Sequence, residues 1–251
     1  MWDSTPGWRR FAICCKPGGA KRERGRARQF PPDGGLCYNR AQGVAPLSGS
    51  DILYFLITLP VLLFALTVHE YAHARVAVKL GDGTPRWEGR LTLNPLAHLD
   101  PVGLLALVLT RRFGWAKPVR VNPMNFENRD AGMVMVSLAG PGANLILAML
   151  FSIMVKFIYG AYGFRGGTIQ LVAVALDQGV WINLGLAVFN LMPIPPLDGS
   201  KILAAVLRGN AARLYYQLEQ YSYIILLVFI ATPVSTWILM PIIGALYRAI
   251  M

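Results

Sequence analysis

The residues best suited to chemistry in this chain are two histidines and a glutamate in the pattern H-E-x-x-H. His69 and His73 are four residues apart, and positions with this spacing lie on the same face of a helix. Their imidazole rings can therefore bind one zinc ion, with Glu70 beside them as a general base. The motif follows an apolar run that carries no charge between Asp51 and Glu70. This combination predicts that peptide bonds are cut within or near a lipid bilayer.

A third metal ligand is expected elsewhere, because a catalytic zinc ion usually has three protein ligands and one open position for water. Asp198 stands out among the acidic residues, since it follows the proline-rich segment 190–197 at the end of an apolar run. The prolines disfavour a helix there, and Gly199 permits unusual backbone angles. An ionisable residue near membrane depth is costly and indicates a functional site. The alternative is that Asp198 caps a helix beginning near Ser200.

The composition is typical of a membrane protein. Hydrophobic residues make up 55% of the 251 residues, whereas soluble domains contain roughly 45–50% apolar residues. The mean hydropathy is +0.45. Several apolar stretches approach the length of about 20 residues that crosses a bilayer as a helix. We therefore expect an all-α polytopic membrane protein with three core transmembrane helices and a C-terminal helical hairpin. The core helices are expected at residues 51–80, 131–159 and 168–192, and the hairpin arms at 215–230 and 235–251, on either side of Pro233.

The segment between the first two expected helices, residues 81–130, is mixed in character. Two short pieces, 87–93 and 119–122, are strand-like and predict a small cytosolic β-hairpin. Residues 100–109 are apolar but too few to cross the bilayer, which favours a re-entrant or interfacial element. The edge of the hairpin would let an extended substrate add as a further strand. The alternative is a hairpin that only covers the site.

The polar N-terminal part differs from the rest and predicts two domains: a basic extension, residues 1–50, and an intramembrane metalloprotease domain, residues 51–251. The net charge of the chain is +11. The extension has nine Lys/Arg and three Asp/Glu, which give it a charge of +6. Residues 51–251 have fifteen Lys/Arg and ten Asp/Glu, which give them a charge of +5. The composition of the extension predicts a disordered arm, and nucleic acid is not expected as a partner. The three cysteines, Cys14, Cys15 and Cys37, all lie in the extension. The membrane domain therefore has no cysteine, which excludes a Cys-ligated zinc site there.

The distribution of Lys and Arg predicts the orientation of the chain, because cytosolic loops carry an excess of these residues. Residues 79–130 contain eight of them and residues 197–213 contain three, whereas the loop 160–168 contains one. Both basic segments are therefore expected in the cytosol, with the active site toward the same side. We expect an integral, multi-pass protein of a bacterial-type cell membrane that contacts the lipid bilayer and a membrane-spanning protein substrate. No oligomeric state is predicted.

Five motifs occur in order along the chain: HEYAHA, GRLTLNPLAHLDPVG, GWAKPV, LAGPGAN and FNLMPIPPLDG. Together they resemble the site-2 protease family of intramembrane zinc metalloproteases, in its compact form without a PDZ domain. The resemblance covers about residues 51–207. It implies one zinc ion per chain, bound by His69, His73 and Asp198. Glu70 is then the catalytic base, and the substrate is a transmembrane or membrane-anchored polypeptide cleaved near the cytosolic face.

Four further polar residues each have two interpretations. Asn144, which ends LAGPGAN, is either a hydrogen-bond donor to the developing oxyanion or a structural link between helices, and the resemblance favours a catalytic role. His98 either holds a loop by hydrogen bonds, which we favour, or acts as an additional zinc ligand. Asn183 and Asn190 share one helix face, where they either orient a zinc ligand or pack against a neighbouring helix.

Three functional classes fit a membrane protein with these residues. A zinc endopeptidase uses every member of the H-E-x-x-H motif. A divalent-cation transporter does not need Glu70 next to His69, and it usually has repeated halves, which are not seen in this sequence. An inactive scaffold that binds membrane helices would not keep the intact motif together with Asp198. The sequence therefore predicts a zinc metalloendopeptidase.

Overall fold

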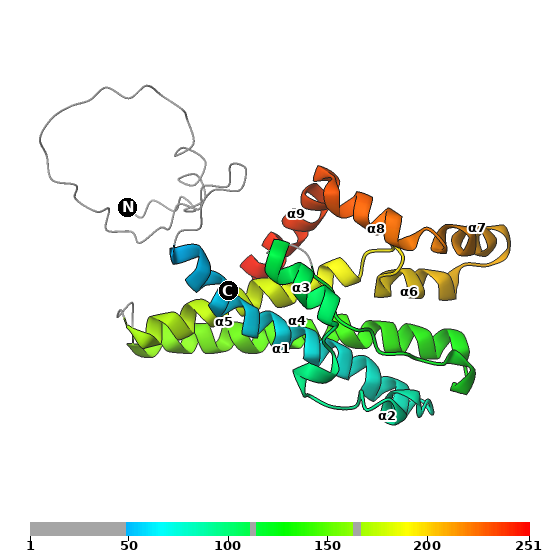
Figure 1. Ribbon diagram of the computed structural model, residues 1–251, viewed down its shortest axis with the longest axis horizontal. Helices are drawn as coiled ribbons and strands as arrows, with labels where there is room; N and C mark the ends of the chain where they lie inside the picture. The colour runs from blue at the N-terminus through cyan, green and yellow to red at the C-terminus, as the bar shows by residue number, and fades with distance from the viewer. Residues whose placement is uncertain (1–48, 111–113, 163–166) are drawn as a thin grey trace, which may run out of the picture. The chain divides into compact units, whose positions relative to one another are not determined.

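The computed structural model describes residues 49–110, 114–162 and 167–251 (Figure 1). The described residues belong to one compact unit, and the predicted basic extension, 1–50, lies almost entirely outside them. Two short 3-10 helices precede α3 and α4, namely η2 (Pro95–Ala97) and η3 (Pro123–Asn125). The α-helices are α1 (Gly49–Lys79), α2 (Thr84–Trp87), α3 (Pro101–Thr110), α4 (Arg129–Tyr162), α5 (Thr168–Asn190), α6 (Asp198–Val206), α7 (Gly209–Glu219), α8 (Ser222–Ala231) and α9 (Pro233–Ile250).

Four helices in the described part of the chain are long and apolar enough to cross a membrane. They are α1 from Phe55 onward, α4, α5 and α9. The first three lie where the sequence analysis expects its core helices, and α9 is the second arm of the expected hairpin. The first arm is shorter than expected, because α8 has only 10 residues and a turn separates it from α7. The expectation of a mostly helical chain with several helices long and apolar enough to cross a membrane is thus confirmed.

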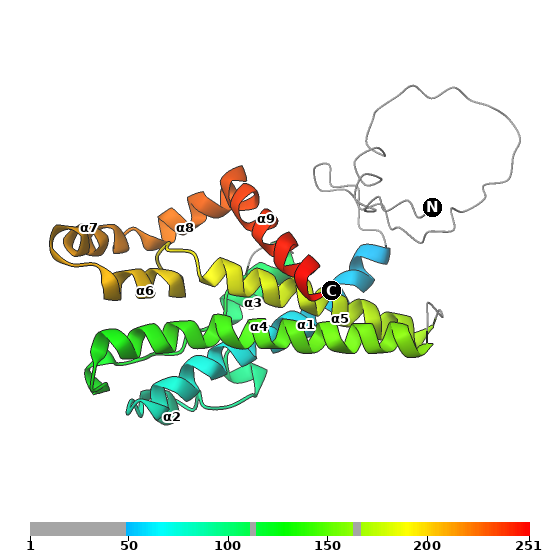
Figure 2. The same cartoon turned by 180° about the vertical axis from the view of Figure 1, so that it is seen from behind.

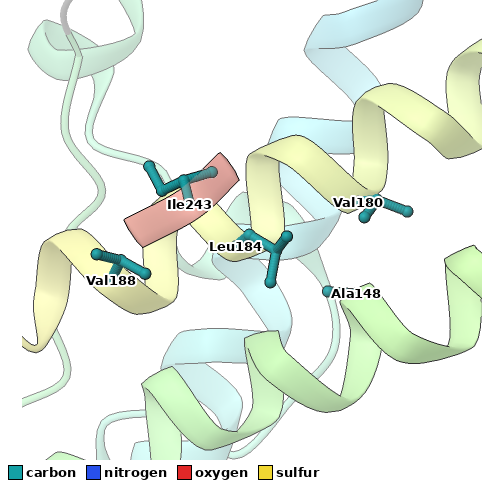
Figure 3. Packing of buried hydrophobic residues seen from close by; sticks show 5 residues of the cluster. All are labelled: Ala148, Val180, Leu184, Val188 and Ile243. Carbon is teal, nitrogen blue, oxygen red and sulfur yellow. The ribbon is translucent and has the colours of Figure 1, made fainter. Parts of the chain in front are cut away.

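The helices α4 and α5 lie side by side in both views of the molecule (Figures 1 and 2). A buried apolar cluster joins them to α9, with Ala148 from α4, Val180, Leu184 and Val188 from α5, and Ile243 from α9 (Figure 3). Because lipid tails are as apolar as these side chains, close van der Waals packing holds such helices together in a bilayer. The cluster therefore fixes α9 against the α4–α5 pair.

The helix α9 runs antiparallel to α5. Ile243 belongs to the same cluster as Leu184 and Val188, and Tyr247, one turn later in α9, donates a hydrogen bond to Asp177 Oδ1 at 2.6 Å. Residue numbers therefore rise along α9 while they fall along α5. A carboxyl group inside a membrane span is costly without a partner, and the Tyr247 hydroxyl supplies one to Asp177.

The helix α1 packs against α4 through small residues, which let two helix backbones come close. Ala77 of α1 is fully buried in a cluster with Val136 of α4 and Phe126. Closer to the middle of α4, Gly140 faces the two histidines of α1 at a distance that leaves no room for a side chain. The α1–α4 contact therefore determines what surrounds the H-E-x-x-H motif.

The short apolar element expected at residues 100–109 is the helix α3. Its 10 residues are too few to cross a bilayer. The side chains of Val102, Leu105 and Leu109 on this helix are exposed. Such a surface suits contact with lipid, as expected of an interfacial or re-entrant element.

The β-hairpin expected within residues 81–130 is not confirmed. The described residues of this segment contain no strand, and an isolated bridge joins Leu99 to Ala116. The first expected strand, 87–93, begins at the last residue of α2. Its strand-like composition is therefore overridden by local helix and turn formation.

The second expected strand lies in the segment 117–122, which has no regular secondary structure. Side chains bind its backbone amides in place of a neighbouring strand. Val119 N–H donates to Glu70 Oε2 at 3.0 Å, and Asn122 N–H donates to Asp82 Oδ2 at 2.7 Å. These two carboxylates take donors that strand pairing needs, and they tie the 117–122 segment to α1 and to the residues that follow it.

Candidate metal centre

The two histidines of the motif lie on one face of α1, as their spacing predicts. Their Nε2 atoms are 3.0 Å apart. Asp198 Oδ2 lies 3.2 Å from the Nε2 of His69 and 3.0 Å from that of His73. All three side chains are buried. Within the part of the chain that the structure describes, His69, His73 and Asp198 form the group of side chains whose ligand atoms converge closely enough to hold a metal ion.

Hydrogen bonds to the outer ring nitrogens determine which nitrogen faces this group. His73 Nδ1 lies 2.7 Å from the carbonyl oxygen of Val136, and His69 Nδ1 lies 2.7 Å from Oδ1 of Asn144. Because a carbonyl oxygen only accepts, the Nδ1 of each neutral ring carries the hydrogen and Nε2 presents a lone pair. Metal-ligating histidines use the same arrangement, since their second nitrogen usually donates to an oxygen.

Two nitrogen lone pairs and a carboxylate oxygen thus face one another in a buried space. Such atoms repel one another unless a cation lies between them. A tetrahedral zinc ion with bonds of about 2.0–2.1 Å places its ligands roughly 3.3 Å apart, and the separations here are 3.0, 3.2 and 3.0 Å. Imidazole and carboxylate are also donor types that zinc accepts. The group therefore fits a zinc ion.

Asp198 reaches the histidines because the chain turns sharply after α5. A Cβ added to Gly199 would lie 2.2 Å from the carbonyl oxygen of Leu191, so the turn requires glycine at this position. Asp198 is the first residue of α6, and the N-cap position is occupied by Leu197. The alternative interpretation of Asp198 as a helix cap is therefore not what the structure shows.

Lys201 binds the outer oxygen of Asp198 from the next turn of α6, with Nζ 3.0 Å from Oδ1. Burial acts to raise the pKa of Asp198, whereas the nearby positive charge of the Lys201 ammonium group acts to lower that pKa and favours the carboxylate. Asp198 therefore remains ionised, as a metal-binding carboxylate must. The sequence analysis missed Lys201, although its spacing of three from Asp198 on a helix was a usable signal.

Gly140 allows α4 to approach the metal-binding group. A Cβ at this position would lie 2.4 Å from Nε2 of His73 and 2.6 Å from Nε2 of His69. In the sequence, this glycine only indicates close helix packing. Its specific requirement becomes evident when α4 is placed against the histidine face of α1.

Glu70 lies beside the histidines in a cavity of about 320 Å³. Parts of α1, α4 and α6, together with the 117–122 segment, form the walls of this cavity. The Oε2 of Glu70 accepts a hydrogen bond from the Val119 N–H, so one carboxylate oxygen is held against the 117–122 segment. The cavity thus combines a metal-binding group with a carboxylate that can act as a base, which is the minimum for metal-assisted hydrolysis.

Asn144 lies behind His69 and does not line this cavity. Its Oδ1 accepts from His69, and its Nδ2 donates to Asn183 Oδ1 at 2.9 Å. Asn183 in turn donates to the carbonyl oxygen of Gly179 at 2.8 Å. Both halves of the Asn144 amide are engaged, so this geometry favours orientation of His69 over donation to an oxyanion.

Asn190 and His98 occupy different surroundings. Asn190 lines the cavity, and its Nδ2 donates to the carbonyl oxygen of Leu186 in the same helix at 2.9 Å. His98 is not a member of the metal-binding group. Its Nε2 lies 2.9 Å from the carbonyl oxygen of Thr92, and its own carbonyl oxygen accepts from Lys117 N–H. These contacts hold the loop, as the favoured interpretation of His98 expects.

Comparison with known proteins adds independent evidence. The sequence model of peptidase family M50 matches residues 167–233. The protein named "Putative zinc metalloprotease YwhC" of Bacillus subtilis is 42% identical over 196 residues, which cover 76% of this chain and 86% of that protein. The "Putative zinc metalloprotease Rip2" of Mycobacterium tuberculosis is 30% identical over 214 residues, which cover 81% of this chain and 77% of that protein. No solved structure matches the chain.

A third relative is similar over a shorter part of the chain. The "Putative zinc metalloprotease MJ0611" of Methanocaldococcus jannaschii is 32% identical over 155 residues, which cover 61% of this chain and 72% of that protein. The names of these relatives agree with the metal-binding group described above. The chain therefore belongs to peptidase family M50, the site-2 protease family, and is a zinc metalloprotease with the helices of a multi-pass membrane protein.

Proposed function

We propose that the chain is an intramembrane zinc endopeptidase that cleaves transmembrane or membrane-anchored polypeptides near the cytosolic face of a bacterial-type cell membrane. The observation that carries this proposal is the presence of Glu70 in the same cavity as His69, His73 and Asp198. Residues 51–251 are proposed to be the protease domain, with one zinc ion per chain.

His69, His73 and Asp198 are the residues that would hold the zinc ion. Zinc bound there would polarise the scissile carbonyl and lower the pKa of a bound water toward roughly 7. Glu70 accepts the proton of the attacking water and later gives it to the leaving nitrogen. The Val119 N–H, 3.0 Å from Oε2, keeps the Glu70 carboxylate turned into the cavity during both transfers.

The proposed cytosolic orientation rests on the charge distribution and on where the ligands lie along their helices. His69 and His73 are near the C-terminal end of α1, and Asp198 follows the C-terminal end of α5. The basic segments 79–130 and 197–213 are next to these two ends, which supports a site on the side that positive charge prefers. A helical substrate buries its amides in its own hydrogen bonds, so it has to unwind before the scissile bond reaches the cavity.

Glu70→Gln tests the chemistry, because glutamine keeps the size of the side chain but cannot accept the proton. The full chain in proteoliposomes is assayed against a panel of single-span substrates, and bound zinc is measured by mass spectrometry. We expect the variant to keep its zinc and to lose at least about a hundredfold in cleavage rate. Cleavage at the wild-type rate would contradict the proposed mechanism.

A matched control is Glu88→Gln, which removes a carboxylate paired with exposed Arg120 outside the cavity. This variant should cleave at the wild-type rate. Asp198→Ala tests the third ligand, and we expect it to lose zinc while the helical content is retained. Zinc flux across the membrane in place of proteolysis would favour the divalent-cation transporter instead.

A further inference from the structure

The hydroxyl of Ser137 in α4 is buried and makes no hydrogen bond. Ser137 is 1% exposed, and its Oγ is one of two buried side-chain atoms in the described residues that lack a partner. A buried hydroxyl without a partner destabilises a fold, so native proteins rarely keep one. Positions that break this rule are often functional.

The position of Ser137 in the wall of the cavity points to a role in the proposed reaction. The residue lines the same cavity as Glu70 and the metal-binding group. It is three residues before Gly140, so both lie on the face of α4 that approaches the histidines. The neighbouring Val136 carbonyl binds His73. The unpartnered hydroxyl thus belongs to the wall of the cavity, beside the groups proposed to cut the peptide bond.

A peptide that enters this cavity brings polar groups of its own. Once a helix unwinds, its backbone carbonyl and amide groups lose their internal partners and need new ones. The 117–122 segment forms another wall of the cavity, but Glu70 already binds the Val119 N–H there. A serine hydroxyl both donates and accepts, so it can bind a backbone carbonyl or amide.

We propose that Ser137 is a substrate-binding residue whose hydroxyl hydrogen-bonds the backbone of the unwound peptide next to the scissile bond. This proposal rests on the proposed function of the same site. No other described residue supplies a partner for Oγ, and the substrate backbone is proposed to do so.

Ser152 provides a matched control in the same helix. It is also buried, at 2% exposure, but its hydroxyl donates to the carbonyl oxygen of Ile250 in α9. Ser152→Ala removes a hydrogen bond that the fold uses, whereas Ser137→Ala removes a hydroxyl that the fold leaves unpaired. Ser152→Ala should therefore lower the stability of the fold, whereas Ser137→Ala should not.

The experiment compares the full chain, Ser137→Ala and Ser152→Ala, each with and without Glu70→Gln. Thermal unfolding and zinc content are measured for all of them. Substrate affinity is measured as the Kd of fluorescently labelled casein, an unstructured protein that needs no unwinding, for the Glu70→Gln forms. Cleavage of casein by the forms with intact Glu70 gives KM and kcat.

We expect Ser137→Ala to unfold at the wild-type temperature or above and to bind zinc normally, while Kd and KM rise about two- to tenfold. Ser152→Ala should unfold at a lower temperature with Kd and KM unchanged. A lower unfolding temperature for Ser137→Ala with unchanged Kd would make Ser137 a structural residue and overturn the proposal. A fall in kcat with unchanged Kd would also overturn it, because the hydroxyl would then act on the attacking water.

The two proposals can fail separately. If Glu70→Gln still cleaves casein, the catalytic assignment is wrong, whereas the difference in Kd between Ser137→Ala and its parent still reports on peptide binding. The role of Ser137 is wrong if the Kd for casein is the same for Glu70→Gln with and without Ser137→Ala. It is also wrong if Glu70→Gln alone does not bind casein, whatever the outcome for Glu70.

Discussion

The metal-binding group depends on the direction in which two ring nitrogens point. Each Nε2 faces the group because the opposite nitrogen donates to an oxygen, that of Val136 for His73 and that of Asn144 for His69. Both oxygens belong to α4, whereas both histidines belong to α1. One helix therefore supplies the ligands and its neighbour orients them.

Gly140→Ala should disrupt the site without disrupting the helix. The added methyl group would lie 2.4 Å from Nε2 of His73, so either the rings or the helices have to move. Alanine is otherwise the more favourable residue in a helix. We expect bound zinc and proteolysis to fall at least about tenfold, while circular dichroism shows unchanged helix content.

Gly142→Ala is the control for this prediction, because it lies in the same helix and a Cβ there would meet nothing within 4 Å. It should retain zinc and activity. If Gly140→Ala binds zinc as tightly as Gly142→Ala, the close approach of α4 to the histidines is not as described.

Asn144→Ala should weaken metal binding through His69. The substitution removes the oxygen 2.7 Å from His69 Nδ1 and leaves Asn183 without the amide that donates to it. Loss of an outer hydrogen bond to a metal-ligating histidine typically costs about 10- to 100-fold in metal affinity. Competition with a zinc chelator measures this affinity.

Asn190→Ala offers a comparison for this measurement, since the Asn190 side chain donates to the carbonyl oxygen of Leu186 in its own helix and not to a histidine. Its zinc affinity should match that of the wild type. Wild-type affinity in Asn144→Ala would return Asn144 to the sequence-based interpretation as a donor to the oxyanion.

The sequence pointed to the members of the metal-binding group, but it did not predict that Val136 and Asn144 orient them. His69 and His73 follow from helical spacing, whereas the position of Asp198 left a ligand and a helix cap both open, and the resemblance to the site-2 protease family favoured the ligand. The oxygen that holds His73 is a backbone carbonyl, which every residue has, so no residue type marks Val136. The requirement for glycine at position 140 likewise depends on the distance between two helices.

At the scale of elements, the 117–122 segment is held by acidic side chains that come from other parts of the chain. Asp82, just after α1, accepts hydrogen bonds from the backbone and side chain of Thr84, from Asn122 N–H and from the side chain of Asn125. Strand prediction from local composition failed here, because these long-range partners are not visible in a short stretch of sequence. Helix prediction succeeded, because apolar length is a local property.

Asp82→Asn should loosen this segment in a pH-dependent way. Burial acts to raise the pKa of Asp82, but hydrogen bonds from Thr84, Asn122 and Asn125 outweigh it and lower the pKa. A carboxyl group with a lowered pKa stabilises the fold fully above its unfolded pKa, about 3.9. That stability is lost as the pH falls through the folded pKa.

The measurement for Asp82→Asn is the unfolding temperature from pH 8 to pH 3. The variant should unfold at a lower temperature than the wild type, by an amount that is constant above about pH 5 and shrinks below about pH 4. It should also lose activity, because the 117–122 segment holds Glu70. A difference that grows as the pH falls would contradict the role of Asp82.

At the scale of the whole molecule, the antiparallel packing of α9 on α5 predicts on which side of the membrane the last residue of α9 lies. If Asn190 at the end of α5 is on the cytosolic side, Pro233 at the start of α9 is on the same side. Ile250 then lies toward the outer side, as does the start of α5. The charge pattern predicts the orientation of the core helices, whereas the packing of α9 predicts the side of the membrane on which Ile250 lies.

Labelling of single cysteines in intact cells tests this arrangement. Cys14, Cys15 and Cys37 are replaced by serine, and one cysteine is introduced by Glu127→Cys or by Met251→Cys. An impermeant maleimide should label Met251→Cys from outside and should label Glu127→Cys only after lysis. Outside labelling of Glu127→Cys would reverse the proposed orientation.

Because α1 supplies the histidines and α4 orients them, their packing has a consequence for the route by which a substrate enters the cavity. A transmembrane protein that wedged these two helices apart would pull Val136 and Asn144 away from the histidines and release the ion before the bond is cut. If the proposed function is right, we therefore expect the polypeptide to enter elsewhere, on the side of the cavity bounded by the 117–122 segment and α6, while α1 and α4 stay packed together.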